Sequence, residues 1–294
     1  MKVFYSRDYV GSAHAFDTTR KAGWIAESLL TQPVPGVQLT RPRALTVEQI
    51  TRVHDADYVD AVVTGACLDL AESQGFEWDP GLAPMVQASN GGAVEAALAA
   101  LRDGVAGSLS SGLHHARYDS GAGFCTFNGL VLAACAAQDA GAANVLILDL
   151  DAHCGGGTAS LIAGRDGIWQ ADVSVDCYDY YVADDRTDLA EVCDAGRYLG
   201  EVGQSLSRIE RLAPRFDLVI YNAGMDPYQG CAVGGLDGVT ADTLARREQL
   251  VFRWCRDRRI PVAFVLAGGY VGTRLDRDLL VALHRSTVTA AAAA

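Results

Sequence analysis

Short hydrophobic runs recur along the chain, and each is followed by a loop rich in glycine or polar residues and then by a helical pattern. The clearest runs predict buried strands at residues 2–6, 104–112, 144–152, 217–224 and 261–269. Helical periodicity predicts helices at residues 46–54, 90–104, 127–141, 240–258 and 276–285, the first with Thr46 as its N-cap. Strands that alternate with helices indicate βαβ units and a mainly parallel sheet covered by helices on both faces.

The pattern also bears on domain organisation. No internal repeat and no linker rich in proline or serine divides the sequence, so residues 1–294 are expected to form a single domain. The closing run of alanines at residues 290–294 is of low complexity, and we expect it to fray.

Composition narrows the classes of partner. The net charge of −12 argues against a nucleic-acid partner, which needs a basic surface. No apolar run reaches the length of about 18 residues expected of a membrane span, so no membrane partner is expected. Polar residues at the start of the chain leave no room for a signal peptide, which favours a cytoplasmic location. The eight cysteines form no C-x-x-C pair and are expected to be reduced and mostly buried.

Side chains capable of chemistry follow four of the predicted strands. They are His114 and His115 after the second strand, Asp151 and His153 after the third, Asp226 after the fourth and Tyr270 after the fifth. Because ligands in parallel α/β sheets bind beyond the carboxyl ends of the strands, we expect these side chains to line one cleft.

Asp151, His153 and Asp226 form a candidate metal site. Zinc binds imidazole nitrogen and carboxylate oxygen, and a catalytic zinc keeps three protein ligands and one open position. Iron(II) accepts the same ligands, so the identity of the metal stays open. A lone Asp-x-His is more often a capped strand end with a core histidine, but a second carboxylate at a matching strand end favours the metal site.

The histidine pair and Tyr270 are candidates for proton transfer and for oxyanion stabilisation. Neighbouring residues of a strand point in opposite directions, so His114 and His115 can reach one water only if their loop leaves the extended form. One imidazole could then take a proton from the attacking water and deliver it to a leaving amine. The Tyr270 hydroxyl could hydrogen-bond an oxyanion. Taken alone, a surface histidine pair and a packed tyrosine are the simpler explanations.

Four segments resemble the serial motifs of the zinc-dependent histone deacetylase superfamily, which includes acetylpolyamine amidohydrolases and acetoin-utilisation-type proteins. They read SGLHHARYDSGAGFCTFNGLVLAA, ILDLDAHCGGGT, NAGMDPYQG and LAGGY, and the likeness extends from about Met1 to Leu283. The resemblance implies the arginase/deacetylase fold, a three-layer α/β/α domain with a central, mainly parallel sheet of eight strands.

The resemblance also implies roles at the reaction centre. By this resemblance, Asp151, His153 and Asp226 would bind zinc. His115 would act as general base and acid with His114 as its companion, and Tyr270 would polarise the scissile carbonyl. The cofactor it implies is zinc (Zn²⁺), with iron (Fe²⁺) as the other candidate.

Further residues match the surroundings of that centre. The substrate tunnel and its rim match Gly123, Phe124, Gly268, Gly269 and, at the rim, Asp79. Asp149 matches the carboxylate that holds His114. A structural potassium (K⁺) site matches the side chains of Asp149 and Ser174 with the backbone carbonyls of Asp151, His153 and Val175.

Two departures from the family pattern stand out. Cys154 replaces a histidine, and Gly156 replaces the acidic or amide residue that normally orients the catalytic histidine, so we expect His115 to lack its partner. The segment after Ser174 lacks the usual loop rich in proline and glycine. One of Tyr178, Tyr180 and Tyr181 is therefore expected to form the second tunnel wall.

The favoured function is a metal-dependent amidohydrolase that removes an acyl group, chiefly acetyl, from an amine partner. Acyl-lysine, acylpolyamine and small acylated amines stay open as substrates, and so does homodimer formation. One alternative is a noncatalytic metal-binding module, which the change at Gly156 favours. Another is a two-metal ureohydrolase of the arginase type, which Gly155 disfavours because that chemistry needs an aspartate there.

Overall fold

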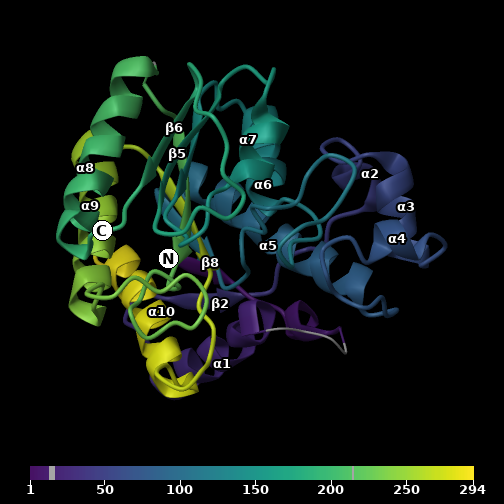
Figure 1. The fold of residues 1–294 in the computed structure, drawn as a ribbon, viewed down its shortest axis with the longest axis horizontal. Helices are drawn as coiled ribbons and strands as arrows, with labels where there is room; N and C mark the ends of the chain where they lie inside the picture. Colours follow the sequence, from purple (N-terminus) through teal and green to yellow (C-terminus); the bar gives the residue numbers. More distant parts are fainter. Residues whose placement is uncertain (13–16, 214) are drawn as a thin grey trace.

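A computed structural model describes residues 1–12, 17–213 and 215–294 (Figure 1). Its centre is a sheet of eight parallel strands in the order β2-β1-β3-β8-β7-β4-β5-β6. The strands are β1 Lys2–Phe4, β2 Gln38–Thr40, β3 Val105–Ser108, β4 Val145–Asp149, β5 Ile168–Ser174, β6 Thr187–Glu191, β7 Leu218–Gly224 and β8 Val262–Ala267. The predicted parallel sheet of eight strands is therefore confirmed.

Helices cover both faces of the sheet, as the alternating pattern predicted (Figure 1). The described helices are η1 Arg7–Val10, α1 Asp17–Thr31, α2 Val47–Ile50, α3 Ala56–Thr64, α4 Leu68–Ala71, α5 Leu82–Asp103, α6 Gly129–Asp139, α7 Gly156–Ile162, α8 Ala195–Leu212, α9 Ala241–Arg258 and α10 Arg277–Ala292. Helices α1, α8, α9 and α10 share one hydrophobic core, and α2, α3, α5, α6 and α7 share the other.

Strand β4 shows how the sheet divides the two cores. Leu146 and Leu148 belong to the core under α8 and α9, whereas Val145 and Ile147 belong to the core under α5 and α6. Alternate side chains of a strand point to opposite faces, and all four are fully buried. The three-layer α/β/α architecture follows from this alternation.

Several predicted boundaries differ from the structure. The helix predicted from residue 90 begins at Leu82, and the one predicted at residues 46–54 ends at Ile50, although Thr46 does cap it by accepting a hydrogen bond from Gln49 N. Helix α10 continues to Ala292, so it includes most of the alanine tail at residues 290–294 that we expected to fray. The cysteines were expected to be mostly buried, but only half of them are, and three of the eight are exposed: Cys67, Cys177 and Cys193.

Three strands were missed by the sequence pattern, and β5 shows why. Its alternate residues Gln170, Asp172 and Ser174 are polar yet fully buried. They face a polar interior beside Asp149 of the neighbouring strand, which pairs with Asp172 in the sheet register. The strands were predicted from continuous hydrophobic runs, and these polar residues interrupt that run in β5.

The strand order explains where the functional residues gather. β3, β8, β7, β4 and β5 are consecutive in the sheet and parallel, so the loops that follow them leave from the same edge. Four of these loops carry the candidate residues, which confirms that the strand ends converge. In the described part of the chain, no helix is both long and apolar enough to cross a membrane.

Candidate active site

A compact cluster of Asp151, His153 and Asp226 lies where β4 and β7 end. One ligand atom from each residue lies within 4.8 Å of the others, and all three side chains are buried. His153 Nδ1 is 3.0 Å from Asp151 Oδ1 and 3.3 Å from Asp226 Oδ2. The structure therefore brings together the three residues that the sequence proposed as metal ligands.

The alternating polar residues after β4 build their own turns. Asp149 Oδ1 accepts a hydrogen bond from Asp151 N at 3.2 Å, and Asp151 Oδ1 accepts one from His153 N at 3.1 Å. Aspartate favours such local turns because its side chain binds a backbone N–H two residues further along. These turns, each spanning two residues, help to orient the side chains of Asp151 and His153.

Gly268 at the end of β8 leaves the space that Asp226 occupies. A Cβ atom at position 268 would lie 2.1 Å from Asp226 Cγ, which no side chain could tolerate without displacing the carboxylate. The following Gly269 has φ of 113°, a backbone conformation that favours glycine. The two glycines therefore shape the wall next to the cluster, and Tyr270 follows them directly.

The donor set fits a divalent metal ion. Two carboxylates and one imidazole are buried together, and Asp226 Oδ2 makes no hydrogen bond among the described residues. Burial, together with the charge of Asp151, raises the pKa of Asp226 to about 6. A cation between the three groups would relieve both the desolvation and the repulsion, and three ligands of this type suit catalytic zinc.

The two adjacent histidines turn their rings into the same site. Leu113, just before them, has φ of 56°, so the loop leaves the extended form as expected. The ring centroids of His114 and His115 are 3.9 Å apart. His114 Nδ1 lies 2.8 Å from Asp149 Oδ2, which agrees with the predicted role of Asp149 in holding His114.

His115 also has a carboxylate partner, which the sequence reasoning missed. Its Nδ1 lies 2.9 Å from Asp179 Oδ2, and Arg117 donates a hydrogen bond to Asp179 Oδ1. The expectation that His115 lacks a partner because of Gly156 was therefore wrong. No local signal identifies Asp179, since the two residues are 64 positions apart in the sequence.

The two histidines differ in charge. Burial lowers the pKa of His114, but the carboxylates of Asp149 and Asp151 outweigh it and raise the value to about 10. Burial and then the charge of His114 lower the pKa of His115 to about 4, despite the hydrogen bond with Asp179. His115 is thus neutral near pH 7 and can accept a proton.

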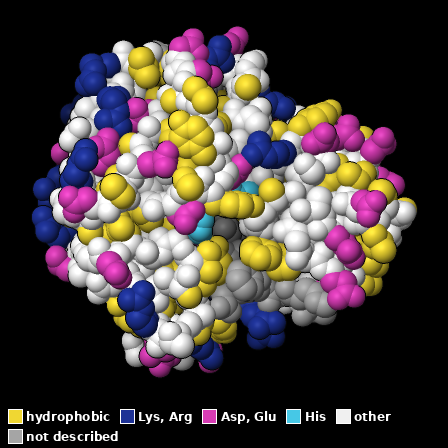
Figure 2. Space-filling model, in the orientation of Figure 1, with side chains coloured by type: hydrophobic (Ala, Val, Ile, Leu, Met, Phe, Trp, Pro, Cys, Tyr) yellow, Lys and Arg dark blue, Asp and Glu magenta, His cyan; other side chains and the backbone are white. Residues whose placement is uncertain are grey.

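Gly123 and the ring of Tyr178 both lie against His115. Gly123 and Phe124 both have positive φ, and a Cβ atom at position 123 would lie 2.5 Å from His115 Cδ2. The Tyr178 ring stands perpendicular to the His115 ring at 4.9 Å between centroids. Of the three tyrosines considered for this wall, Tyr178 therefore has a ring contact with His115. In Figure 2, histidine side chains lie in a hollow near the middle of the face, bordered by hydrophobic side chains.

The remaining predicted residues occupy the surroundings. Ser174 Oγ lies 3.1 Å from Cys154 Sγ, so the residue that replaces the family histidine contacts the predicted potassium ligand. Asp79 accepts hydrogen bonds from Gly81 N at 2.7 Å and from Ser12 Oγ, at the start of α5. Binding of a substrate backbone by Asp79 stays a prediction.

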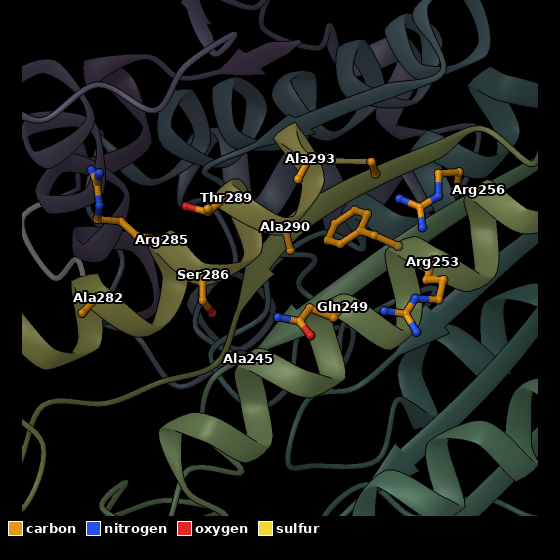
Figure 3. A pocket seen from close by; sticks show the side chains of 12 residues that line it. Ala245, Gln249, Arg253, Arg256, Ala282, Arg285, Ser286, Thr289, Ala290 and Ala293 are labelled. Atoms are coloured by element: carbon orange, nitrogen blue, oxygen red, sulfur yellow. The ribbon is translucent and has the colours of Figure 1, made fainter.

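A separate pocket of about 490 Å³ opens between α9 and α10 (Figure 3). Arg253 and Arg256 lie at one end of it and Arg285 at the other, so these cations do not converge on a common point. None of the candidate site residues lines this pocket.

Comparison with known proteins agrees with the geometry. Residues 14–181 match the histone deacetylase domain. An uncharacterized protein of Picosynechococcus sp. is 32% identical over 91% of each chain, and histone deacetylase 2 of Arabidopsis thaliana is 30% identical over 66% of this chain and 52% of its own length. Acetylpolyamine amidohydrolase 1 of Pseudomonas aeruginosa is 29% identical over 53% of this chain and 48% of its own.

Two crystal structures share the fold. The HD domain of HDA15 superposes with a TM-score of 0.80 at 22% identity, covering 99% of this chain and 89% of that domain. The acetylpolyamine aminohydrolase of Burkholderia pseudomallei superposes with a TM-score of 0.75 at 21% identity, covering 100% of this chain and 99% of its own. The two structures show that the fold is shared, and the match of residues 14–181 to the histone deacetylase domain shows that the chain belongs to the histone deacetylase family.

Proposed function

We propose that this protein is a metal-dependent amidohydrolase that removes an acyl group, chiefly acetyl, from an amine. The observation that carries the proposal is the buried cluster of Asp151, His153 and Asp226, with the ring centroids of His115 and His153 only 6.0 Å apart. A metal ion held by these three residues would polarise the substrate carbonyl and make water acidic enough to attack near neutral pH.

The side chains of the chain supply the proton transfers. His115 accepts the proton of the attacking water at Nε2 while its Nδ1 hydrogen-bonds Asp179. A carbon–oxygen bond to the carbonyl forms, the carbon–nitrogen bond breaks, and His115 returns the proton to the leaving amine. Tyr270 donates a hydrogen bond to the carbonyl oxygen as negative charge develops there.

Zinc is the metal we propose, because imidazole and carboxylate donors in a three-ligand site suit it, and iron(II) is the second candidate. We further propose a structural potassium ion near Asp149 and Ser174. Asp172 supports a cation in this region: it is fully buried opposite Asp149, and its Oδ1 makes no hydrogen bond within the described residues.

The proposed substrate is an acylated amine whose free form is cationic. The net charge of −12 would attract such a molecule, and two relatives are named for acetylpolyamines. Acyl-lysine and small acylated amines are the other members of this class. Homodimer formation and a cytoplasmic location remain predictions.

The contact of Asp179 with His115 removes the main argument for a noncatalytic metal-binding module. That argument rested on the absence of a residue to orient His115, and that histidine does have a carboxylate partner. The arginase-type alternative needs a second group of acidic ligands. Within the described residues, Asp151, His153 and Asp226 form the only group of three or more such side chains that could hold a metal.

The decisive test is a side-by-side screen of acetyl-lysine peptides, acetylpolyamines and small acetylated amines. We expect turnover of at least one class, loss of turnover after chelation, and recovery with Zn²⁺ or Fe²⁺. Replacement of Tyr270 by phenylalanine should lower kcat about 100- to 1,000-fold, as for other single oxyanion donors. Tyr180→Phe, on an exposed ring, is the matched control.

Two results would contradict the proposal. One is the absence of turnover on the whole panel by protein loaded with metal. The other is activity that survives complete removal of metal.

A further inference from the structure

The carboxylate partner of His115 comes from a different segment than the family pattern assigns. In that pattern an acidic or amide residue at position 156 orients the catalytic histidine, and this chain has glycine there. Asp179 lies instead in the loop after β5, with φ of 58° and its side chain only 6% exposed. The loop therefore inserts a buried carboxylate into a place that the start of α7 leaves free.

We propose that Asp179 is the positioning residue of the catalytic histidine, taking over the role that the family assigns to position 156. The inference rests on the proposed function, since it concerns the histidine that transfers the proton. It assigns a role to a residue that the family motifs do not include.

Hydrogen bonds to both oxygens hold the Asp179 carboxylate in place. Oδ2 accepts hydrogen bonds from Gly157 N at 3.0 Å and from His115 Nδ1 at 2.9 Å, while Oδ1 accepts one from Arg117. Both oxygens therefore face donors. A carboxylate held in this way keeps the ring proton of neutral His115 on Nδ1 and leaves Nε2 to receive a proton.

Gly156 and Asp179 are sterically complementary. A Cβ atom at position 156 would lie 2.3 Å from the Asp179 carbonyl oxygen and 2.6 Å from its Oδ1. A carboxylate at position 156 and the present loop thus exclude each other. The glycine is a requirement of the relocated partner, and not simply the loss of the usual one.

Cys154, the other departure from the family pattern, holds the same loop. Its backbone N donates to Tyr178 O at 3.0 Å, and its Sγ lies 3.5 Å from Asp176 O. Tyr178 and Asp179 consequently contact His115 from two directions, one with a ring and one with a carboxylate. Position 154 thus contacts the same loop that brings Asp179 to the histidine, through its backbone and through the Cys154 thiol.

Asp179→Asn tests the proposal with little change of shape. Both oxygens of Asp179 accept hydrogen bonds, but an asparagine side chain has only one acceptor oxygen. In either orientation, its NH2 group would therefore face a donor: Arg117 in one orientation, or His115 and Gly157 in the other. We expect kcat to fall about 10- to 100-fold with KM nearly unchanged, as for other residues that orient catalytic ligands. Metal content and unfolding temperature should stay near those of the wild type.

Asp185→Asn is the matched control, because it removes an exposed carboxylate from the segment that follows the same loop. It should keep wild-type kcat. The proposal is overturned if Asp179→Asn keeps wild-type kcat on a substrate that the wild type turns over. It is also overturned if kcat falls only in proportion to lost metal or lost folded protein.

Nitrogen-15 NMR of the histidine rings provides a readout that needs no turnover. In the wild type we expect the His115 proton on Nδ1, in a signal that His115→Asn removes and Asp179→Asn shifts or abolishes. A proton on Nε2 in the wild type, or a signal that ignores Asp179→Asn, would overturn the proposal. Because this measurement does not use a substrate, it separates failure of the inference from failure of the proposed function.

Gly156→Ala tests the steric half of the argument while keeping the carboxylate. The added methyl group should displace the loop at residue 179 and lower kcat in the same range as Asp179→Asn, again with little change in KM. Wild-type kcat and an unshifted His115 signal in this variant would show that the loop does not depend on the glycine.

Discussion

At the scale of single residues, burial decides how each histidine behaves. His54 is almost fully buried between two backbone groups: its Nδ1 lies 2.7 Å from Arg117 O, and its Nε2 accepts a hydrogen bond from Asn128 N at 2.9 Å. These partners require a neutral ring with the proton on Nδ1. His54 thus holds the backbone of Arg117, the residue that binds Asp179.

The same environment predicts how His54 contributes to stability. Burial lowers the pKa of His54 to about 4, with a smaller contribution from the charge of Arg165. The value in the folded state lies below that in the unfolded chain, about 6.5. The neutral ring therefore stabilises the fold fully above about pH 6.5, and this contribution is lost as the pH falls toward 4.

We expect the stability difference between the wild type and His54→Gln to shrink by about 3 kcal/mol between pH 7 and pH 4, from the size of the pKa shift. Urea denaturation of both proteins at a series of pH values measures it. Subtracting the variant removes the contributions of the other titrating groups. A difference that stays constant over this range would contradict the assigned pKa.

At the scale of elements, the ends of the strands determine the geometry of the site. The predicted bounds of α6 and α9 agree closely with the observed ones: α9 buries one face of a periodic pattern, whereas α6 is apolar and buried along most of its length. β5 and β6 escaped prediction because polar residues interrupt their hydrophobic runs. The candidate ligands could be predicted since each lies directly after a strong apolar strand.

Gly268 provides a test at this scale. Gly268→Ala should weaken metal binding about tenfold or more, because the new methyl group displaces the Asp226 carboxylate. Competition with a chromogenic chelator measures the affinity. Gly200→Ala in α8 is the control: a Cβ atom there meets nothing within 4 Å, so it should leave metal affinity unchanged and add about 0.5–1 kcal/mol of stability. Equal metal affinity in both variants would contradict this account of β8.

At the scale of the whole molecule, a buried ion pair joins α9 to the strands beneath the metal cluster. Arg247 and Glu248 are both fully buried. Arg247 donates to Leu150 O at 3.1 Å, next to a candidate ligand, and Glu248 accepts from the Tyr221 hydroxyl at 2.8 Å. The pair therefore links the helix to the ends of β4 and β7.

Arg247→Met should lower the free energy of unfolding by about 3–5 kcal/mol, because it leaves the buried charge of Glu248 without its positive partner. The double variant Arg247→Met/Glu248→Gln removes that charge and should recover part of the loss. Urea denaturation of the wild type and the three variants completes the double-mutant cycle. Simple additivity of the two single effects would show that the pair is not coupled.

The alternation of strands and helices and the candidate metal ligands could both be identified from the amino-acid sequence. Both depend on local rules, namely the period of apolar residues and the turns that aspartates form after a strand. The contact of Asp179 with His115 and the position of the Tyr178 ring depend on how distant segments pack together. Those contacts join segments 64 residues apart, and they exist because β4 and β5 pair and Gly156 leaves space between them.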